Sequence, residues 1–446
     1  MDTLTLARVT SGKLIGPNLP VSSFSVDTRT LKPGQVFVAL KGERFDGHDF
    51  IKEAYEKGAP AVISQKPFSP PEGRSLVLVS STLEALRKIA AYKRSLFKGV
   101  VIGVGGSAGK TTTKELLAFL LEEKGKVFKT PGNLNSQVGL PLSIANAPLE
   151  ADFWVLEMGA SRLGEIRRLV EVARPRVRVL TALGEEHLEG FGSFEGVVRA
   201  NGELFEFMKE EDAAVMPKEA ERFYGVKRRA LFGPGTPYWP SGVVTGLEGS
   251  RFRFRGVCFE AGVPGEGFLR SCMASFAALE LLGFRAEEFK ERLKGFRGVE
   301  GRMRVIKMRN FTVVDDCYNA NPLSFENLLK TAAAVGGKKV FIVGDMLELG
   351  SYSRARHEEL GEKLTALAPE LVVFYGKEVR YAYERFKGKA VYCEREEELA
   401  EALSRSGQEL KDAVIFIKGS RGVRLERAVE LLGGIDDGLS RRDLSS

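Results

Sequence analysis

The stretch Gly99-Val-Val-Ile-Gly-Val-Gly-Gly-Ser-Ala-Gly-Lys-Thr-Thr-Thr113 decides the fold of the middle of this chain. Its first half is a short apolar, β-branched run, which is typical of a buried strand. Its second half is rich in glycine and leads into a helical pattern over Thr111–Lys124. Glycines let several backbone N–H groups point at one anion, and the helix start adds partial positive charge. The stretch predicts a phosphate-binding loop, with Lys110 near the outer phosphates and Thr111 on magnesium.

The spacing of this loop is a shortened variant of the strict P-loop pattern. The strict pattern needs glycine at position 104, where the chain has Val104. The alternative is a glycine-rich turn that only caps a helix. The strand before the loop, the helix after it and the Lys-Thr pair favour phosphate binding over that alternative.

Strand patterns recur on both sides of a change in sequence character near residue 298. In the middle of the chain they fall at Phe153–Met158, Val177–Leu183 and Ala213–Met216, with helical patterns between them. After Val299 they fall at Phe311–Asp315, Lys339–Val343, Leu371–Tyr375 and Val414–Lys418, with a helix predicted over Arg354–Leu367. Strands that alternate with helices predict parallel sheets, whose carboxyl ends carry ligand sites. The first 97 residues mix short strands and turns and end in a helical stretch at Thr82–Leu96, and the tail from Gly433 is expected to be loose.

Composition narrows the class of protein. The 446 residues carry 66 Lys and Arg against 59 Asp and Glu, a net charge of +7 with both signs interleaved. This balance suits a small polyanionic substrate and argues against a nucleic-acid partner. No apolar run approaches the ~18 residues of a membrane span. The four scattered cysteines and the absence of a signal-like start predict a cytoplasmic protein, and we expect a monomer.

Three acidic or basic candidates follow predicted strands. Glu157 ends an otherwise apolar strand, His187 follows the next one, and Asp315-Asp316 follows a strand of the last block. Each has an ordinary alternative: a surface-facing strand end, a lone surface histidine, or turn chemistry. Together with a nucleotide loop they predict a magnesium-assisted site in the cleft between two α/β domains.

The order of motifs along the chain resembles the Mur ligase family, over nearly the whole length. The motifs that carry the resemblance are Ser25–Arg29, Pro33–His48, Gly106–Thr112, Gly132–Asn135, Glu157–Ala160, Gly184–Gly192, Gly301–Met303, Asp315–Pro322, Gly344–Gly350, His357 and Lys418–Gly422. The segments Tyr318-Asn-Ala-Asn-Pro322 and Gly344-Asp-Met-Leu-Glu-Leu-Gly350 are most similar to the branch that adds D-alanyl-D-alanine.

The resemblance implies an α/β fold of three domains. These are a small mixed α/β N-terminal domain (1–97) for a UDP-sugar, a central parallel-sheet P-loop ATPase domain (98–298), and a Rossmann-like α/β C-terminal domain (299–446). The implied reaction is ATP- and Mg²⁺-dependent amide formation between UDP-N-acetylmuramoyl-tripeptide and D-Ala-D-Ala through an acyl phosphate, in the cytoplasmic part of peptidoglycan synthesis. Closure of the C-terminal domain is expected to assemble the site and exclude water.

The resemblance also implies roles for individual residues. Lys110, Glu157, His187 and Arg302 are expected to be catalytic, and Thr111, Glu157 and His187 to hold metal. The expected nucleotide contacts are Gly105, Gly106, Ser107, Ala108, Gly109, Lys110, Thr111, Thr112, Asn133, Arg302 and Asp316. The expected contacts to the uridine end are Asp27, Thr28, Arg29, Phe45, Asp46, Gly47 and His48, and those on the acceptor side are Asn319, Asn321, Lys418, Ser420 and Arg421.

Several positions depart from the family pattern near the nucleotide. The lysine whose carbamate binds a second magnesium in the family aligns with Asn201, which cannot be carbamoylated. The other departures are Ser161, Arg162, Ala182, Leu269 and Met273. One hypothesis is an active enzyme whose second metal is held by Glu186, Glu203 or a water. The alternatives are a ligase with a different acceptor amine and a weakened paralogue that only binds nucleotide or UDP-sugar.

Overall fold

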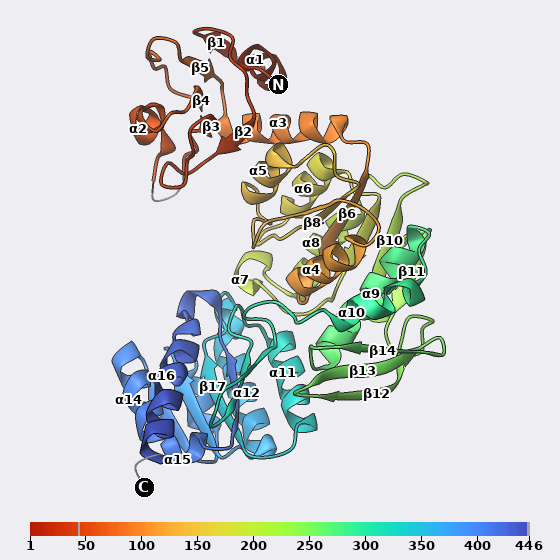
Figure 1. Ribbon diagram of the computed structural model, residues 1–446, viewed down its shortest axis with the longest axis vertical. Coiled ribbons are helices and arrows are strands. Elements are labelled where there is room, and N and C mark those ends of the chain that lie inside the picture. The colour runs from red at the N-terminus through yellow and green to blue at the C-terminus, as the bar shows by residue number, and fades with distance from the viewer. Residues whose placement is uncertain (43–44, 444–446) are drawn as a thin grey trace.

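The computed structural model describes residues 1–42 and 45–443, which form four sheets (Figure 1). The N-terminal sheet has the order β1-β5-β4-β3-β2, and only β1 runs antiparallel to its neighbour. Its strands are β1 (Lys13–Ile15), β2 (Ser23–Ser25), β3 (Gln35–Val38), β4 (Ala61–Ser64) and β5 (Ser75–Leu78). The helices beside it are α1 (Thr3–Thr10), α2 (Ile51–Glu56) and α3 (Thr82–Leu96).

The central sheet is entirely parallel, with the order β11-β10-β9-β6-β8-β7. Its strands are β6 (Val100–Gly105), β7 (Val127–Lys129), β8 (Phe153–Glu157), β9 (Val177–Leu180), β10 (Ala213–Pro217) and β11 (Arg229–Phe232). The helices of this part are α4 (Lys110–Leu121), α5 (Gly139–Asn146), α6 (Glu165–Ala173), α7 (Leu188–Phe191), α8 (Phe194–Gly202), α9 (Glu266–Leu281) and α10 (Lys290–Lys294). Because all strands point the same way, β6, β8 and β9 deliver their following loops to one edge.

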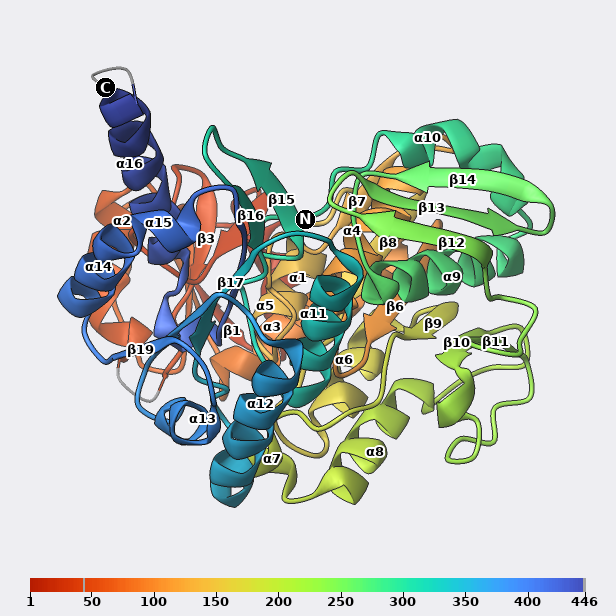
Figure 2. The same cartoon turned by 90° about the horizontal axis from the view of Figure 1, so that it is seen from below.

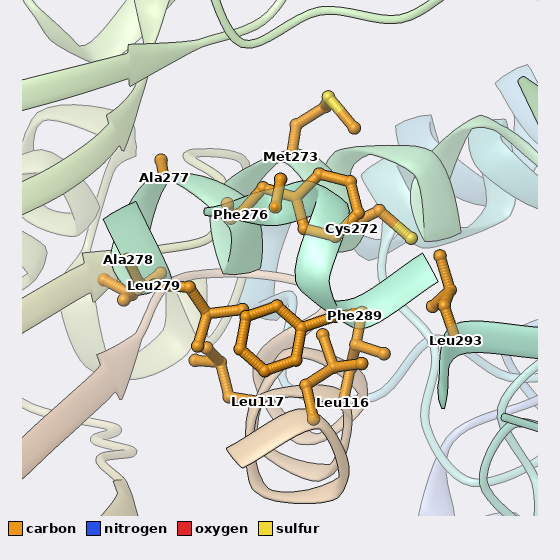
Figure 3. Packing of buried hydrophobic residues seen from close by; sticks show 14 of the residues in the cluster. Leu116, Leu117, Cys272, Met273, Phe276, Ala277, Ala278, Leu279, Phe289 and Leu293 are labelled. Carbon is orange, nitrogen blue, oxygen red and sulfur yellow. The ribbon is translucent and has the colours of Figure 1, made fainter. Parts of the chain in front are cut away.

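A small antiparallel sheet is inserted between β11 and α9. It consists of β12 (Ser241–Gly246), β13 (Gly249–Phe254) and β14 (Val257–Ala261). Buried phenylalanines of this sheet, among them Phe252 and Phe259, pack on Phe276 of α9. Figure 3 shows the helix at the centre of this core, with Phe276 and Cys272 above Leu116 of α4. The insert therefore holds α9 against the helix that follows the phosphate loop.

The C-terminal sheet has the order β15-β16-β20-β17-β18-β19 and is parallel except for β15. Its strands are β15 (Arg304–Lys307), β16 (Thr312–Asp315), β17 (Lys339–Gly344), β18 (Leu371–Tyr375), β19 (Ala390–Cys393) and β20 (Val414–Lys418). Its helices are α11 (Pro322–Ala334), α12 (Ser353–Leu367), α13 (Arg380–Arg385), α14 (Glu396–Arg405), α15 (Gly407–Leu410) and α16 (Glu426–Asp443). The three parts lie in an arc, with the C-terminal part against the central one and far from the N-terminal sheet (Figure 1); Figure 2 shows α11 and α12 on the side that faces the central part.

The fold confirms the predicted class, an α/β chain with parallel sheets, and every predicted strand is present. Strands β7, β11, β15 and β19 and the antiparallel insert were not predicted, because they are short or lie in exposed, weakly patterned sequence. The strand predicted over Val177–Leu183 ends at Leu180, because Thr181 turns to the phosphate loop and donates to the carbonyl oxygens of Gly105 (3.1 Å) and Ala108 (2.6 Å). The prediction of a loose tail was wrong as far as Asp443, since α16 continues there.

His357 joins α12 to the loop after β17. Its side chain is fully buried; Nε2 accepts from the Met346 N–H at 3.0 Å, and Nδ1 lies 2.8 Å from the Ser353 carbonyl oxygen. These two bonds require the neutral ring, with its proton on Nδ1. Burial lowers the pKa of His357 below its ordinary value of 6.5.

We expect His357 to make the stability of the C-terminal domain depend on pH. The unfolded ring takes up a proton below its ordinary pKa while the folded ring resists protonation, so this contribution is complete above 6.5 and is lost as pH falls below it. The loss approaches about 1.4 kcal/mol per pH unit. Urea unfolding at a series of pH values measures it, and a slope that is the same in wild type and His357→Gln would contradict the assignment.

Candidate active site

The phosphate loop lies between β6 and α4, as predicted. Gly106 has φ of +127°, and a Cβ there would lie 2.4 Å from the Thr181 hydroxyl oxygen, so both conformation and space demand glycine. Lys110 donates from Nζ to the Gly106 carbonyl oxygen at 2.5 Å, which holds its ammonium group over the loop. The first N–H groups of α4 and this ammonium form an anion site.

Glu157 is held beside the loop at the end of β8. Its side chain is buried, and Oε1 accepts from the Thr111 hydroxyl at 3.2 Å and from Asn135 Nδ2 at 2.8 Å. Oε2 has no hydrogen-bond partner among the described residues, although it lies 3.6 Å from Nζ of the buried Lys114. A buried carboxylate beside a threonine hydroxyl fits Mg²⁺, a hard cation that uses one or two protein oxygens and keeps several waters.

The loop after β9 does not present His187 as an isolated ligand. His187 has φ of +44°, and its Nδ1 pairs with the carboxylate of Glu348 from the C-terminal part. The preceding Glu186 is buried and lies 3.3 Å from Lys110 Nζ through Oε2. The assignment of His187 to a metal therefore stays a prediction, and the histidine bridges two parts of the molecule.

The structure shows what Asn201 contacts, and how Glu186 and Glu203, the two predicted replacements for the family's lysine, are engaged. Its Nδ2 donates to the Val197 carbonyl oxygen at 3.1 Å and lies 3.5 Å from Glu186 Oε1. Glu203 instead accepts from the backbone N–H groups of Gly164 (2.6 Å) and Arg167 (3.0 Å), at the start of α6. Glu203 thus serves as a helix cap, and an oxygen ligand from Glu186 or from a water beside Asn201 stays a prediction.

Two C-terminal side chains reach the phosphate loop directly. Arg302 donates from Nη2 to the Thr111 hydroxyl at 3.1 Å, and its guanidinium lies 4.2 Å from the ring centre of Tyr318. Asn321 donates from Nδ2 to the Ser107 carbonyl oxygen at 3.0 Å, while its Oδ1 accepts from the Ser324 N–H at the start of α11. The amide of Asn321 is therefore engaged with the loop and the helix rather than free for an acceptor amine.

Asp316 and Lys418 form a buried ion pair. Lys418 Nζ lies 2.5 Å from Asp316 Oδ2 and donates to the Asn319 carbonyl oxygen at 3.0 Å, while Asp316 Oδ1 accepts from the Met303 N–H. Burial raises the pKa of Asp316 and lowers that of Lys418, and their mutual attraction opposes both shifts. The prediction had placed them on different ligands, whereas the structure brings them onto each other.

One cavity of about 560 Å³ unites these groups. Of the predicted site residues, it is lined by Ser107, Ala108, Gly109, Lys110, Thr111, Thr112, Asn133, Glu157, His187, Arg302, Asp316, Asn319, Asn321, Lys418, Ser420 and Arg421. Sequence reasoning missed Tyr318, Asn327 and Glu348, which also line it; the position of Tyr318 between motif residues was the available signal. Leu269 and Met273 are buried in the core around α9, so those two departures remove no cavity residue.

The predicted uridine contacts lie outside this cavity, in the N-terminal part. Asp46 accepts from His48 Nδ1 at 2.5 Å and Lys66 Nζ at 2.8 Å, and His48 Nε2 accepts from the Gln65 N–H at 3.0 Å. Hydrogen bonds from Lys66 and His48 hold the pKa of Asp46 well below its usual range. Both ring nitrogens of His48 are used inside the protein.

The same region offers exposed groups. The Asp27 carboxylate binds the Arg29 guanidinium at 2.6 Å, and the Arg29 side chain is largely exposed. Phe45 is 75% exposed. Thr28 is buried, and Gly47 starts a short 3₁₀ turn. Phe45 and Arg29 are therefore the most exposed residues of this set.

A P-loop that faces a second α/β part across one cavity defines a nucleotide-dependent enzyme of several domains. Family models match most of the chain: "Mur ligase family, catalytic domain" over residues 20–94, "Mur ligase middle domain" over 104–232, and "Mur ligase, glutamate ligase domain" over 301–421. The chain belongs to the Mur ligase family.

Similar proteins cover the same length. The UDP-N-acetylmuramoyl-tripeptide--D-alanyl-D-alanine ligases of Bacillus subtilis and Escherichia coli are 33% and 31% identical, over 95% and 97% of this chain and 96% and 99% of theirs. Among solved structures, MurF from Acinetobacter baumannii has a TM-score of 0.90 at 27% identity, covering 97% of this chain and 98% of its own. MurF ligase from Thermotoga maritima in complex with ADP has a TM-score of 0.83 at 35% identity, covering 95% and 99%.

The buried pair gives a stability prediction. Lys418→Met leaves the Asp316 carboxylate buried without its ammonium partner, which we expect to cost about 3–5 kcal/mol of folding free energy. Thermal or urea unfolding measures the loss. The double variant Asp316→Asn with Lys418→Met recovers much of it, because no charge is then buried; equal stability of wild type and Lys418→Met would refute this account.

Proposed function

We propose that the protein is an ATP-dependent amide ligase that adds D-alanyl-D-alanine to UDP-N-acetylmuramoyl-tripeptide. The observation that carries this proposal is the cavity in which the phosphate loop, Glu157 and Arg302 converge. The names of the full-length relatives supply the substrates. The peptide carboxylate attacks the γ-phosphate of ATP with release of ADP, and the amine of D-Ala-D-Ala then displaces phosphate from the acyl phosphate. No group of the protein needs to become covalently attached.

The residues of the chain divide this work by position. Lys110 and the N–H groups at the start of α4 bind the transferring phosphoryl group and neutralise the charge that develops on it. Thr111 and Glu157 would hold Mg²⁺, which when bound supplies further positive charge to the phosphate oxygens. Arg302 adds its charge from the opposite wall, and the C-terminal part shields the reactive intermediate from water.

The three domains take separate parts in this scheme. Residues 1–97 bind the UDP-sugar end, with Arg29 and Phe45 as the exposed contacts; residues 98–298 bind ATP; and residues 299–446 contribute Arg302 and the acceptor side. Asn319, Ser420 and Arg421 line the cavity and are the candidates for acceptor contacts. We further propose that Glu186 replaces the lysine carbamate of the family near Asn201. The site of action is the cytoplasm, where nucleotide-linked precursors are made; in the part of the chain that is described, no helix is long and apolar enough to span a membrane.

The product mass tests the acceptor. The protein is incubated with ATP, Mg²⁺, UDP-N-acetylmuramoyl-tripeptide and either D-Ala-D-Ala or single amino acids. We expect the mass of D-Ala-D-Ala less one water, together with stoichiometric phosphate. Addition of one residue identifies a different acceptor amine, and binding of the UDP-peptide with no phosphate above background identifies a binding protein and overturns the proposal.

Lys110 gives a kinetic prediction that can be tested beside a matched control lysine. Lys110→Met removes the ammonium held over the phosphate loop, and we expect kcat to fall by about 10²–10³-fold. Lys98→Met, at an exposed lysine just before β6, controls for loss of one positive charge. Phosphate release under saturating substrates measures both. Equal kcat values for the two variants would remove Lys110 from the mechanism.

A further inference from the structure

Three consecutive side chains of the loop Gly184–His187 contact the phosphate loop and the C-terminal part. Glu185 pairs with Arg356 of α12, Glu186 with Lys110 of the phosphate loop, and His187 with Glu348. The loop also fits closely against α11, since a Cβ on Gly184 would lie 2.8 Å from Leu323 Cδ2. One short segment thus connects the ammonium of the phosphate loop to the C-terminal domain.

The contact between Glu185 and Arg356 has the geometry of a strong ion pair. Arg356 donates from Nε to Oε2 at 2.6 Å and from Nη2 to Oε1 at 2.5 Å, so both carboxylate oxygens are used. The two side chains are 23% and 32% exposed. Single-bonded surface pairs contribute little, but a two-pronged pair with restricted solvent access holds orientation as well as distance.

Arg356 is itself fixed on its helix. Its Nη1 lies 2.8 Å from Glu359 Oε2, one turn further along α12. The next residue, His357, accepts a hydrogen bond from the Met346 N–H. Glu348, the partner of His187, follows two residues after Met346. The ion pair is therefore tied through α12 to the second contact of the same loop.

We propose that Glu185 and Arg356 are positioning residues that hold the C-terminal domain against the central domain, and so keep Arg302 and Asn321 on the phosphate loop. Neither residue lines the cavity, so the pair acts on the reaction only through the residues that do. For its kinetic consequence the proposal rests on the ligase activity proposed above, whereas its structural consequence is independent of that activity.

A double-mutant cycle in the full-length protein tests the kinetic consequence. Glu185→Gln and Arg356→Gln are each expected to lower kcat/KM for ATP about tenfold, and the double variant to be no slower than either single variant, because one shared interaction is lost. Glu359→Gln is the matched control: it removes the other partner of Arg356 and leaves the pair intact, with activity near wild type. Losses that multiply in the double variant would overturn the proposal.

An interdomain distance tests the structural consequence without requiring catalysis. Cys258 is exposed on β14 and the other three cysteines are buried, so labels on Cys258 and on Lys387→Cys report the separation of the two domains. We expect Glu185→Gln and Arg356→Gln to move the distribution to longer distances at unchanged melting temperature, and Glu359→Gln to match the unmutated pair. If Arg356→Gln does not fold, Glu185→Gln gives the same measurement. Identical distance distributions in all variants would refute the positioning role of Glu185 and Arg356. A shifted distribution in a protein without ligase activity would refute only the proposed function.

Discussion

The structure depends on one arrangement, in which side chains from two domains meet at the phosphate loop. The phosphate loop supplies one wall with Lys110 and the start of α4. The other wall is brought by the C-terminal domain, through Arg302 on the Thr111 hydroxyl and Asn321 on the Ser107 carbonyl oxygen. A charged transition state is stabilised best by fixed donors in a site closed to water.

The apolar contacts and the charged contacts around the phosphate loop lie in different places. The apolar core around α9 and the antiparallel insert packs against α4, directly behind the loop. The charged contacts, by contrast, lie at the seam between domains, where Glu185, His187 and Lys307 each pair with a residue of the other side. Ion pairs suit an interface between domains because they fix the orientation of the two surfaces, and because exposed charges can separate into water at little cost in free energy.

The buried charged groups near the cavity are neutralised or hydrogen-bonded within the protein. Asp316 and Lys418 were each assigned a ligand from sequence, yet they neutralise one another at 2.5 Å. Burial of either charge alone would cost folding free energy. Charged side chains can therefore be buried at the carboxyl ends of β16 and β20 only as a pair. Glu203 follows the same logic, because its carboxylate caps α6. Residue type identified these groups as polar, and only the structure showed that they are buried and which partners they have.

The sequence by itself determined the phosphate loop, the parallel sheets and the family, because these depend on local spacing and on the period of apolar residues. It also predicted that Lys110, Thr111, Glu157 and Arg302 share one site, and all four line the same cavity. Only the tertiary structure decided which charges face one another: Glu185 with Arg356, His187 with Glu348, and Asp316 with Lys418. The reason is physical, since a pairing between residues 102 to 171 positions apart is set by how the chain packs in space, and no local pattern encodes it.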